Sequence, residues 1–171
     1  FVQEYRGAKL RMVGAGLVHG GLLFACGGDG SGERAMFAVK LGKEPGLAWR
    51  LDKGTPYVPC ILARGQHLYT VNDEGAVVCR DAKTGDEAWR QRLPSSVSAS
   101  PVLVEGRLFV FGEKGEATVI EAKPDKPRVL GKNSVGEAVF ASPAVAGGRL
   151  YVRGSKHLFC IGTPKGKGDG R

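Results

Sequence analysis

One short phrase occurs four times in this chain, and it constrains the fold more than any other feature. In each copy a glycine is followed within four residues by leucine and an aromatic residue. The four leucine–aromatic pairs lie at 23–24, 68–69, 108–109 and 150–151, so the steps between copies are 45, 40 and 42 residues. A repeat of this length, built from short apolar runs and glycine turns, is typical of a β-propeller with four strands in each blade.

The runs between the turns predict strands. In the third copy, residues 98–104, 107–111 and 117–122 are rich in β-branched, aromatic and other apolar side chains, and turns at 105–106 and 112–115 separate them. Glycine supplies the positive φ that tight hairpin turns need. No stretch of the chain has a sustained helical period. We therefore expect an all-β fold of propeller blades, each a four-stranded antiparallel sheet, with about four blades present and the last one incomplete.

The second copy carries a longer motif. Residues 81–89 read Asp-Ala-Lys-Thr-Gly-Asp-Glu-Ala-Trp, and Ser-Pro pairs precede apolar runs at 100–101 and 142–143. This motif resembles the blade-docking sequence Asp-x-x-Thr-Gly-x-x-x-Trp of PQQ-repeat β-propellers, and the resemblance covers roughly residues 12–162. That family includes quinoprotein alcohol dehydrogenases and BamB-like lipoprotein scaffolds of outer-membrane protein assembly. The resemblance implies a ring of about seven or eight blades, so we expect the chain to be the C-terminal half of a longer protein.

The docking motif has a structural interpretation. The residues that we expect to dock the blades are Asp81, Thr84, Gly85, Trp89 and Trp49. The aspartate and threonine can accept hydrogen bonds from backbone amides in a hairpin, the glycine makes the turn, and the tryptophan fills the gap between blades. In the third copy Glu121 replaces the aspartate and Val129 is expected at the tryptophan position. The fourth copy stops at Gly162, before an outermost strand.

The chain divides into two parts. Residues 1–162 are expected to form the propeller repeats, and 163–171, a tail rich in glycine and lysine, is expected to be disordered. An open half-ring exposes an unpaired blade face at each end, through which two chains could form a homodimer.

The sequence contains no apolar run long enough to span a membrane. An export signal would lie upstream of Phe1, and we expect a periplasmic or otherwise exported protein.

Positive charge is concentrated near the C-terminus. The chain has 25 basic and 17 acidic residues, and residues 123–171 account for 10 of the basic and 3 of the acidic ones. This imbalance favours an acidic protein or another anionic polymer or ligand as a partner, although a solvated blade rim with a basic tail explains it equally simply. Nucleic acid is not expected, because no nucleic-acid-binding motif accompanies the charge. The candidate contact residues are Arg149, Arg153 and Lys156, near the turns of the fourth copy.

The four cysteines do not form a recognisable site. Cys26, Cys60, Cys79 and Cys160 have spacings that match no zinc motif, and no disulfide framework is implied. Cys79 and Cys160 occupy matching places in their repeats, and equivalent places in neighbouring blades are too far apart for a disulfide. We expect both to be small buried core residues.

Two classes of function are compatible with these patterns. The first is a non-catalytic propeller that binds a protein or another ligand on one face, with no catalytic, cofactor-binding or metal-binding residues and no cofactor. The alternative is part of a PQQ-dependent quinoprotein dehydrogenase, which would bind PQQ with calcium. The resemblance implies for such enzymes a carboxylate base, acidic and amide metal ligands, and often a disulfide between adjacent cysteines, and this chain has no adjacent cysteines. We therefore favour the platform.

Overall fold

The computed structural model describes residues 11–28 and 32–162, and every regular element in this part of the chain is a β-strand. Blade 1 contains β1 (Leu17–His19), β2 (Leu22–Gly28), β3 (Arg34–Lys40) and β4 (Gly46–Leu51). Blade 2 contains β5 (Leu62–Arg64), β6 (His67–Val71), β7 (Ala76–Asp81) and β8 (Glu87–Arg92). Blade 3 contains β9 (Val102–Val104), β10 (Arg107–Phe111), β11 (Glu116–Glu121) and β12 (Val129–Ser134). Blade 4 contains β13 (Ala144–Ala146), β14 (Arg149–Arg153) and β15 (Leu158–Ile161).

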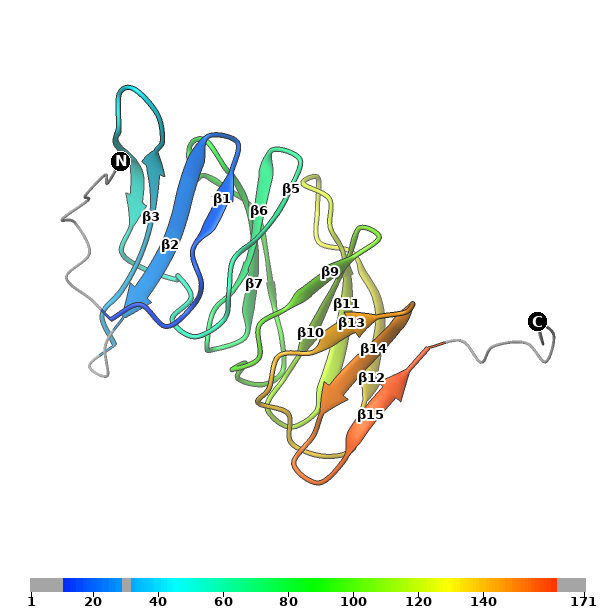
Figure 1. Cartoon of the computed structure of the whole chain (residues 1–171). Coiled ribbons are helices and arrows are strands. Elements are labelled where there is room, and N and C mark those ends of the chain that lie inside the picture. Colours follow the sequence, from blue (N-terminus) through cyan, green and yellow to red (C-terminus); the bar gives the residue numbers. More distant parts are fainter. Residues whose placement is uncertain (1–10, 29–31, 163–171) are drawn as a thin grey trace.

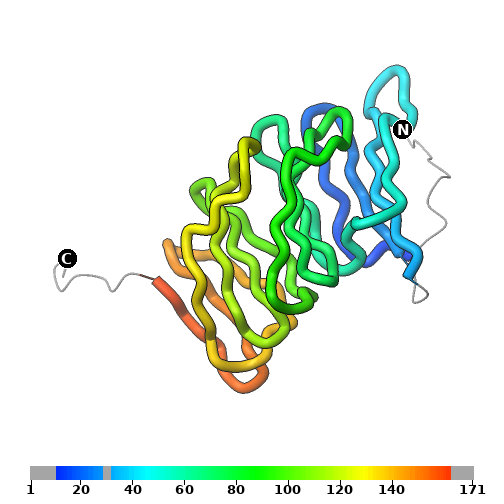
Figure 2. Tube along the Cα trace, turned by 180° about the vertical axis from the view of Figure 1, so that it is seen from behind, coloured from blue at the N-terminus to red at the C-terminus, as the bar shows by residue number. Residues whose placement is uncertain are grey.

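Each blade is an antiparallel meander in which strands adjacent in the chain are adjacent in the sheet. The four blades stand side by side in a row, with blade 1 at one end and blade 4 at the other (Figures 1 and 2). The predicted all-β propeller fold with about four blades is confirmed, and blade 4 has three strands among the described residues. The tail predicted to be disordered lies outside the described residues.

Tight turns at one edge of the row join the first two strands of a blade. In the β9–β10 turn both central residues have positive φ, 47° at Glu105 and 75° at Gly106. In the β13–β14 turn the values are 55° at Gly147 and 69° at Gly148. Two consecutive positive φ angles are characteristic of the turn type whose twist matches that of antiparallel strands, so local sequence sets these hairpins.

The hydrophobic core lies between the blades. Strands β6 and β7 are buried along nearly their whole length because blades 1 and 3 cover the two faces of blade 2. Tyr69 and Cys79 face blade 3 and pack with Leu108, whereas Leu68 faces blade 1 and packs with Phe24. This explains why the inner strands read as almost continuous apolar runs rather than as an apolar–polar alternation.

The docking motif works across a blade boundary. The indole of Trp49, in blade 1, donates a hydrogen bond to the carbonyl of Ala82 in blade 2 at 3.0 Å. Gly85, with φ 81°, leaves no room for a Cβ because the face of the same indole lies against it. Trp89 repeats the arrangement by donating to the carbonyl of Lys123 in blade 3 at 2.7 Å. Each tryptophan therefore binds the loop of the next blade rather than the loop of its own copy.

The aspartate and threonine of the motif organise that loop. Asp81 Oδ1 accepts hydrogen bonds from the amides of Lys83 at 2.8 Å and Thr84 at 3.0 Å. These bonds, the Thr84 bond foremost, hold the pKa of Asp81 below its ordinary value. Thr84 Oγ1 in turn accepts from the amide of Asp86 at 3.2 Å. The loop is therefore preformed to receive the indole of Trp49.

The structure corrects one assignment in the third copy. In blade 2 Cys79 pairs with Trp89, and the counterpart of Cys79 in blade 3, Val119, pairs with Gly131. Gly131, and not Val129, therefore stands at the tryptophan position. The expectation of Val129 was wrong because the loop joining β11 to β12 is two residues longer than the loop joining β7 to β8.

The structure also corrects the expectation for one cysteine. Cys79 is buried as expected, but Cys160 is exposed. Both occupy the same place in the register of their blades, yet blade 3 covers Cys79 and no described element covers that face of blade 4. All four cysteines are free thiols.

Candidate binding groove

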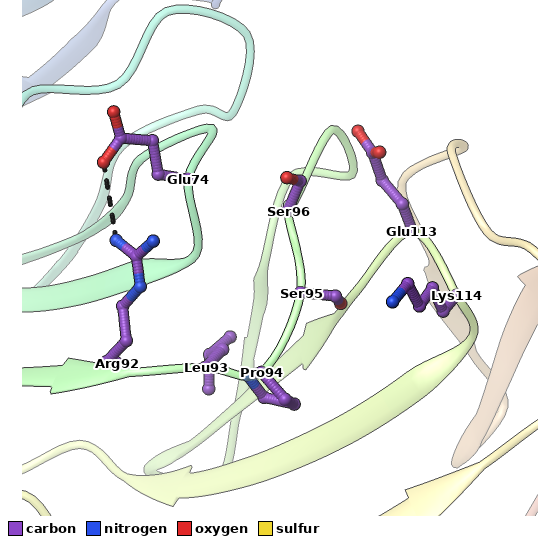
Figure 3. A pocket seen from close by; sticks show the side chains of 8 residues that line it. All are labelled: Glu74, Arg92, Leu93, Pro94, Ser95, Ser96, Glu113 and Lys114. Carbon is purple, nitrogen blue, oxygen red and sulfur yellow. Dashed lines mark hydrogen bonds and ion pairs between the residues drawn. The ribbon is translucent and has the colours of Figure 1, made fainter.

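The edge of the row that carries the β6–β7 and β10–β11 turns is hollowed at two equivalent places. The hollow between blades 2 and 3 has a volume of about 380 Å³, and the hollow between blades 1 and 2 about 280 Å³. The larger hollow (Figure 3) is lined by Glu74, Arg92, Leu93, Pro94, Ser95, Ser96, Glu113 and Lys114. The smaller hollow is lined by Gly32, Arg34, Asp52, Lys53, Gly54, Thr55, Asn72, Asp73 and Glu74. Glu74 lines both hollows, which lie on either side of the β6–β7 turn, and the two together are here named the turn-face groove.

Repetition of the fold creates this groove. Each hollow is bounded by a hairpin turn and by the connector that leaves the outer strand of a blade for the next blade. The connectors are residues 52–61 after β4 and 93–101 after β8. Neighbouring blades therefore place chemically different side chains at geometrically equivalent positions.

The β6–β7 turn, which separates the two hollows, is held rigidly. Asn72 Oδ1 accepts a hydrogen bond from the amide of Ala76 at 2.7 Å, and the amide of Leu93 donates to the carbonyl of Gly75 at 2.8 Å. Gly75 has φ 86°, and a Cβ there would overlap the carbonyl oxygen of Ser95. Glycine is therefore required where the connector passes over the turn.

Two carboxylates fix the connectors to the turns. Asp73 accepts hydrogen bonds from the amides of Tyr57 at 3.0 Å and Val58 at 3.2 Å. Its counterpart in the next turn, Glu113, accepts from the hydroxyl of Ser98 at 2.5 Å. These two carboxylates therefore stabilise the walls of the groove by hydrogen bonds within the protein.

Other charged groups of the larger hollow face solvent. Glu74 and Arg92 form an exposed ion pair with 3.4 Å between Oε2 and Nη1. Ser95 donates from its hydroxyl to Glu116 at 2.9 Å, and Figure 3 shows the Ser95 and Lys114 side chains facing one another across the hollow. An exposed ion pair such as Glu74–Arg92 contributes only about 0–1 kcal/mol to stability. A binding partner can therefore replace this ion pair with its own contacts at small energetic cost.

The smaller hollow has a partly buried cation on its wall. The Arg34 guanidinium lies over the ring of Tyr57, 4.5 Å from the ring centroid, and 3.9 Å from Asp73 Oδ2. The hydroxyl of Thr55 is buried without a hydrogen-bond partner in the part of the chain that the structure describes. The wall therefore combines a cation, which the Tyr57 ring supports from behind, with a buried hydroxyl.

The groove offers hydrogen bonds and charge of both signs. Within residues 11–28 and 32–162, no three His, Cys, Asp or Glu side chains gather in a way that could hold a metal ion. The same residues include no helix with the length and hydrophobicity needed to cross a membrane.

The candidate contact residues from the sequence do not form one cluster. Arg153 and Lys156 flank the β14–β15 turn, whereas Arg149 lies at the other end of β14, about 13 Å away at the usual rise per strand residue. The amide of Lys156 donates to Glu137 at 2.8 Å, and its side chain is exposed. Arg149 Nη1 lies 3.8 Å from Cys160 Sγ.

Sequence reasoning missed the groove. The turn at 112–115 was predicted only as a hairpin turn, although residues 72–75 occupy the matching place in the second copy. That correspondence was the available signal, since equivalent turns of neighbouring blades lie side by side at one edge of a propeller. The connector residues gave no comparable signal.

Comparison with known proteins identifies the family. The family model described as outer membrane protein assembly factor BamB matches residues 43–128, which is half of the chain. No curated protein matches the chain.

Solved structures share the fold at low sequence identity. BamB from Moraxella catarrhalis is 16% identical with a TM-score of 0.64, and the match covers 85% of this chain and 41% of that one. The computationally designed Ika4 protein is 13% identical with a TM-score of 0.72, covering 95% of this chain and all of that one. A europium-containing methanol dehydrogenase is 15% identical with a TM-score of 0.56, covering 74% and 26%. The chain thus spans less than half the length of the BamB structure and, by its repeats, its blades and its family match, belongs to the family of PQQ-repeat β-propeller proteins.

Proposed function

We propose that this chain is a non-catalytic platform that binds a partner protein in the turn-face groove. The observation that carries the proposal is the presence of two neighbouring hollows on the same edge, which share Glu74 of the β6–β7 turn. Two hollows that follow one another along the edge of three blades suit an extended polypeptide segment better than a compact small molecule.

The chemistry of the groove supports this proposal. Arg92 and Lys114 are basic and Glu74 and Glu113 are acidic, and Leu93 and Pro94 also line the larger hollow. Charges of both signs give a partner register and orientation, and the small apolar patch supplies desolvated contact area.

The family match supports a proposal about location and partner class. The matching family is described as an assembly factor for outer membrane proteins, and one structural neighbour is BamB. By this likeness we propose an extracytoplasmic location and a partner among the proteins of an outer-membrane assembly machinery. Because the chain covers 41% of the BamB structure, these points rest on the part that it shares.

Site-specific photo-crosslinking tests the platform. A photo-reactive amino acid at Ser96, in the groove, is compared with one at Lys83, which is exposed in the β7–β8 loop at the opposite edge. The expected result is one discrete adduct from position 96 in cell envelopes, lost when Glu74→Arg and Lys114→Glu reverse the groove charges. Adducts of equal yield from both positions, or none from position 96, would contradict the proposal.

The proposal assigns no cofactor to the chain. Incubation with PQQ and Ca²⁺ followed by gel filtration is expected to leave no quinone absorbance in the protein peak. Stoichiometric quinone retained by the protein would favour the quinoprotein dehydrogenase instead.

A further inference from the structure

The interface between blades 3 and 4 contains a cavity of about 280 Å³ with mostly apolar walls. Its apolar lining residues are Val104, Phe109, Val145, Leu150 and Ile161. The cavity opens beside the β9–β10 and β13–β14 turns, at the edge of the row opposite the turn-face groove. It is a separate site and does not depend on the function proposed for that groove.

In the other two interfaces an indole fills the corresponding space. The Trp49 ring lies 5.8 Å from the Phe24 ring, and the Trp89 ring 6.1 Å from the Tyr69 ring, between centroids. Phe109 is the counterpart of Phe24 and Tyr69 in blade 3. Two of three equivalent interfaces therefore hold a tryptophan against this aromatic position.

The third interface has no such indole. The register places Gly131 where Trp49 and Trp89 stand in blades 1 and 2. A Cβ built on Gly131 would meet only Asn133 Nδ2, at 4.0 Å, so no main-chain group occupies the space. Phe109 consequently lacks the aromatic partner that its counterparts have.

A second side chain is shortened in the same interface. At the end of the innermost strand, His19 Nε2 lies 2.7 Å from the carbonyl oxygen of Gly65, and Arg64 donates to the carbonyl of Ala122 at 2.6 Å. Val104 holds this position in blade 3 and has no polar group to reach blade 4. Loss of the indole and of the bridging side chain together leaves the cavity.

We propose that this cavity receives a tryptophan side chain from a partner polypeptide. The two sister interfaces show that blade faces of this family bind an indole between them, and the walls Phe109 and Leu150 are counterparts of Tyr69 and Leu108, which pack with Trp89. A volume of 280 Å³ lies just below the range of about 300–1,000 Å³ for pockets that hold drug-sized ligands. It suits a single aromatic side chain.

Residues 162–171 supply no indole for the cavity. Residues 162–171 follow directly from β15 and contain no aromatic or branched aliphatic side chain. The lining includes one acidic residue, Glu105, and one basic residue, Arg149. Because residues 123–171 carry a surplus of basic residues, acidic residues beside the partner tryptophan are expected to strengthen binding.

A synthetic peptide with one tryptophan flanked by aspartates tests the site, with the tryptophan replaced by alanine as the matched peptide. The tryptophan is fluorinated so that ¹⁹F NMR reports only the peptide. Saturable binding by the tryptophan peptide is expected, with at least a tenfold weaker affinity for the alanine peptide.

Two cavity-filling variants and one control variant test whether the peptide binds in this cavity. Gly131→Trp supplies the missing indole and Val104→Arg the missing bridge, and each is expected to weaken peptide binding at least tenfold. Lys132→Trp adds the same indole one residue away, where the regular register places the side chain on the other face of β12, and is expected to bind as the wild type does. Gly131→Trp is also expected to raise the midpoint of thermal unfolding, which shows that it folds.

The proposal is overturned if the wild type does not bind the tryptophan peptide, or if both filling variants bind it unchanged. Glu74→Arg, in the turn-face groove, is expected to leave peptide binding intact. If position 96 gives no crosslink but the tryptophan peptide still binds, only the function proposed for the turn-face groove is contradicted. If position 96 gives the crosslink but the peptide does not bind, only the proposal for the cavity is contradicted.

Discussion

Blades 2 and 4 present the same hairpin to different surroundings. The face of blade 2 toward blade 3 carries Tyr69, Val71, Val77 and Cys79, each no more than 1% exposed. The strand register places Tyr151, Arg153, Leu158 and Cys160 at the same positions in blade 4. There Leu158 is 65% exposed and Arg153 faces solvent. The hairpin fixes which way a side chain points, but the neighbouring blade decides whether that direction is the core.

Exchanging one residue between the two faces gives the largest expected effect. Val71→Arg buries an unpaired guanidinium and is expected to cost more than about 4 kcal/mol, enough to unfold much of the array. Arg153→Val, at the matching position of blade 4, is expected to stay within about 0.5 kcal/mol. Urea unfolding of both variants measures the difference. Similar losses would mean that the two faces are equally covered in solution.

The same Arg153→Val variant tests pairing of chains through blade 4. It enlarges the apolar area beside Tyr151 and Leu158, so we expect more self-association than in the wild type. Light scattering at several protein concentrations gives the mass. An unchanged mass would exclude this face as the surface of a homodimer.

Removal of a docking indole is expected to give the next largest loss in the free energy of unfolding. Trp89→Ala removes the ring that packs on Tyr69 and donates to the Lys123 carbonyl, with an expected cost of about 3–5 kcal/mol. Val129→Ala, at the half-exposed position first expected to be its counterpart, should cost less than about 0.5 kcal/mol. Denaturant midpoints measure both, and equal costs would contradict the register that places Gly131 at the tryptophan position.

The two equivalent cysteines should differ in thiol reactivity. Burial raises the pKa of Cys79 to about 11, so little thiolate is present at pH 8, and blade 3 also blocks access. Cys160 is exposed. In single-cysteine variants, native Cys160 is expected to react with a disulfide reagent at least about a hundredfold faster than Cys79. Rates that become equal in urea would show that folding causes the difference, whereas equal rates in the native state would contradict it.

The smallest expected effect concerns the link from blade 3 to the blade 4 turn. Burial raises the pKa of Glu137, but hydrogen bonds to its carboxylate from the amides of Lys156 and His157 and from the Ser155 hydroxyl outweigh this and lower the pKa below its ordinary value. A lowered folded pKa means that this carboxylate stabilises the fold above its unfolded pKa, near 4.5, and that the stabilisation is lost as pH falls through the folded pKa.

Amide chemical shifts of the blade 4 turn measure this titration. Lys156 and His157 should move together with a midpoint below pH 4.5, and Glu137→Gln should abolish the movement. A midpoint above that value in the wild type would contradict the proposed role of the three hydrogen bonds.

Features set within one hairpin were predictable from the sequence. The glycine turns, the strands and the four blades depend on neighbours a few residues apart, and the repeat made each copy support the others. The docking residues could be named from their motif, but the motif does not show that Trp49 binds the loop containing Gly85 while Trp89 binds the next blade.

Features that depend on two blades were decided by tertiary structure. The exposure of Cys160, the placement of Gly131 opposite Val119 and the groove shared through Glu74 each depend on loop length or on the surface that a neighbouring blade provides. By itself the sequence determined how each blade folds, because turn geometry and strand alternation are local. Only the packing of blades decided which faces are covered, which contain a cavity and which are free to bind, because burial depends on residues about forty positions away in the chain.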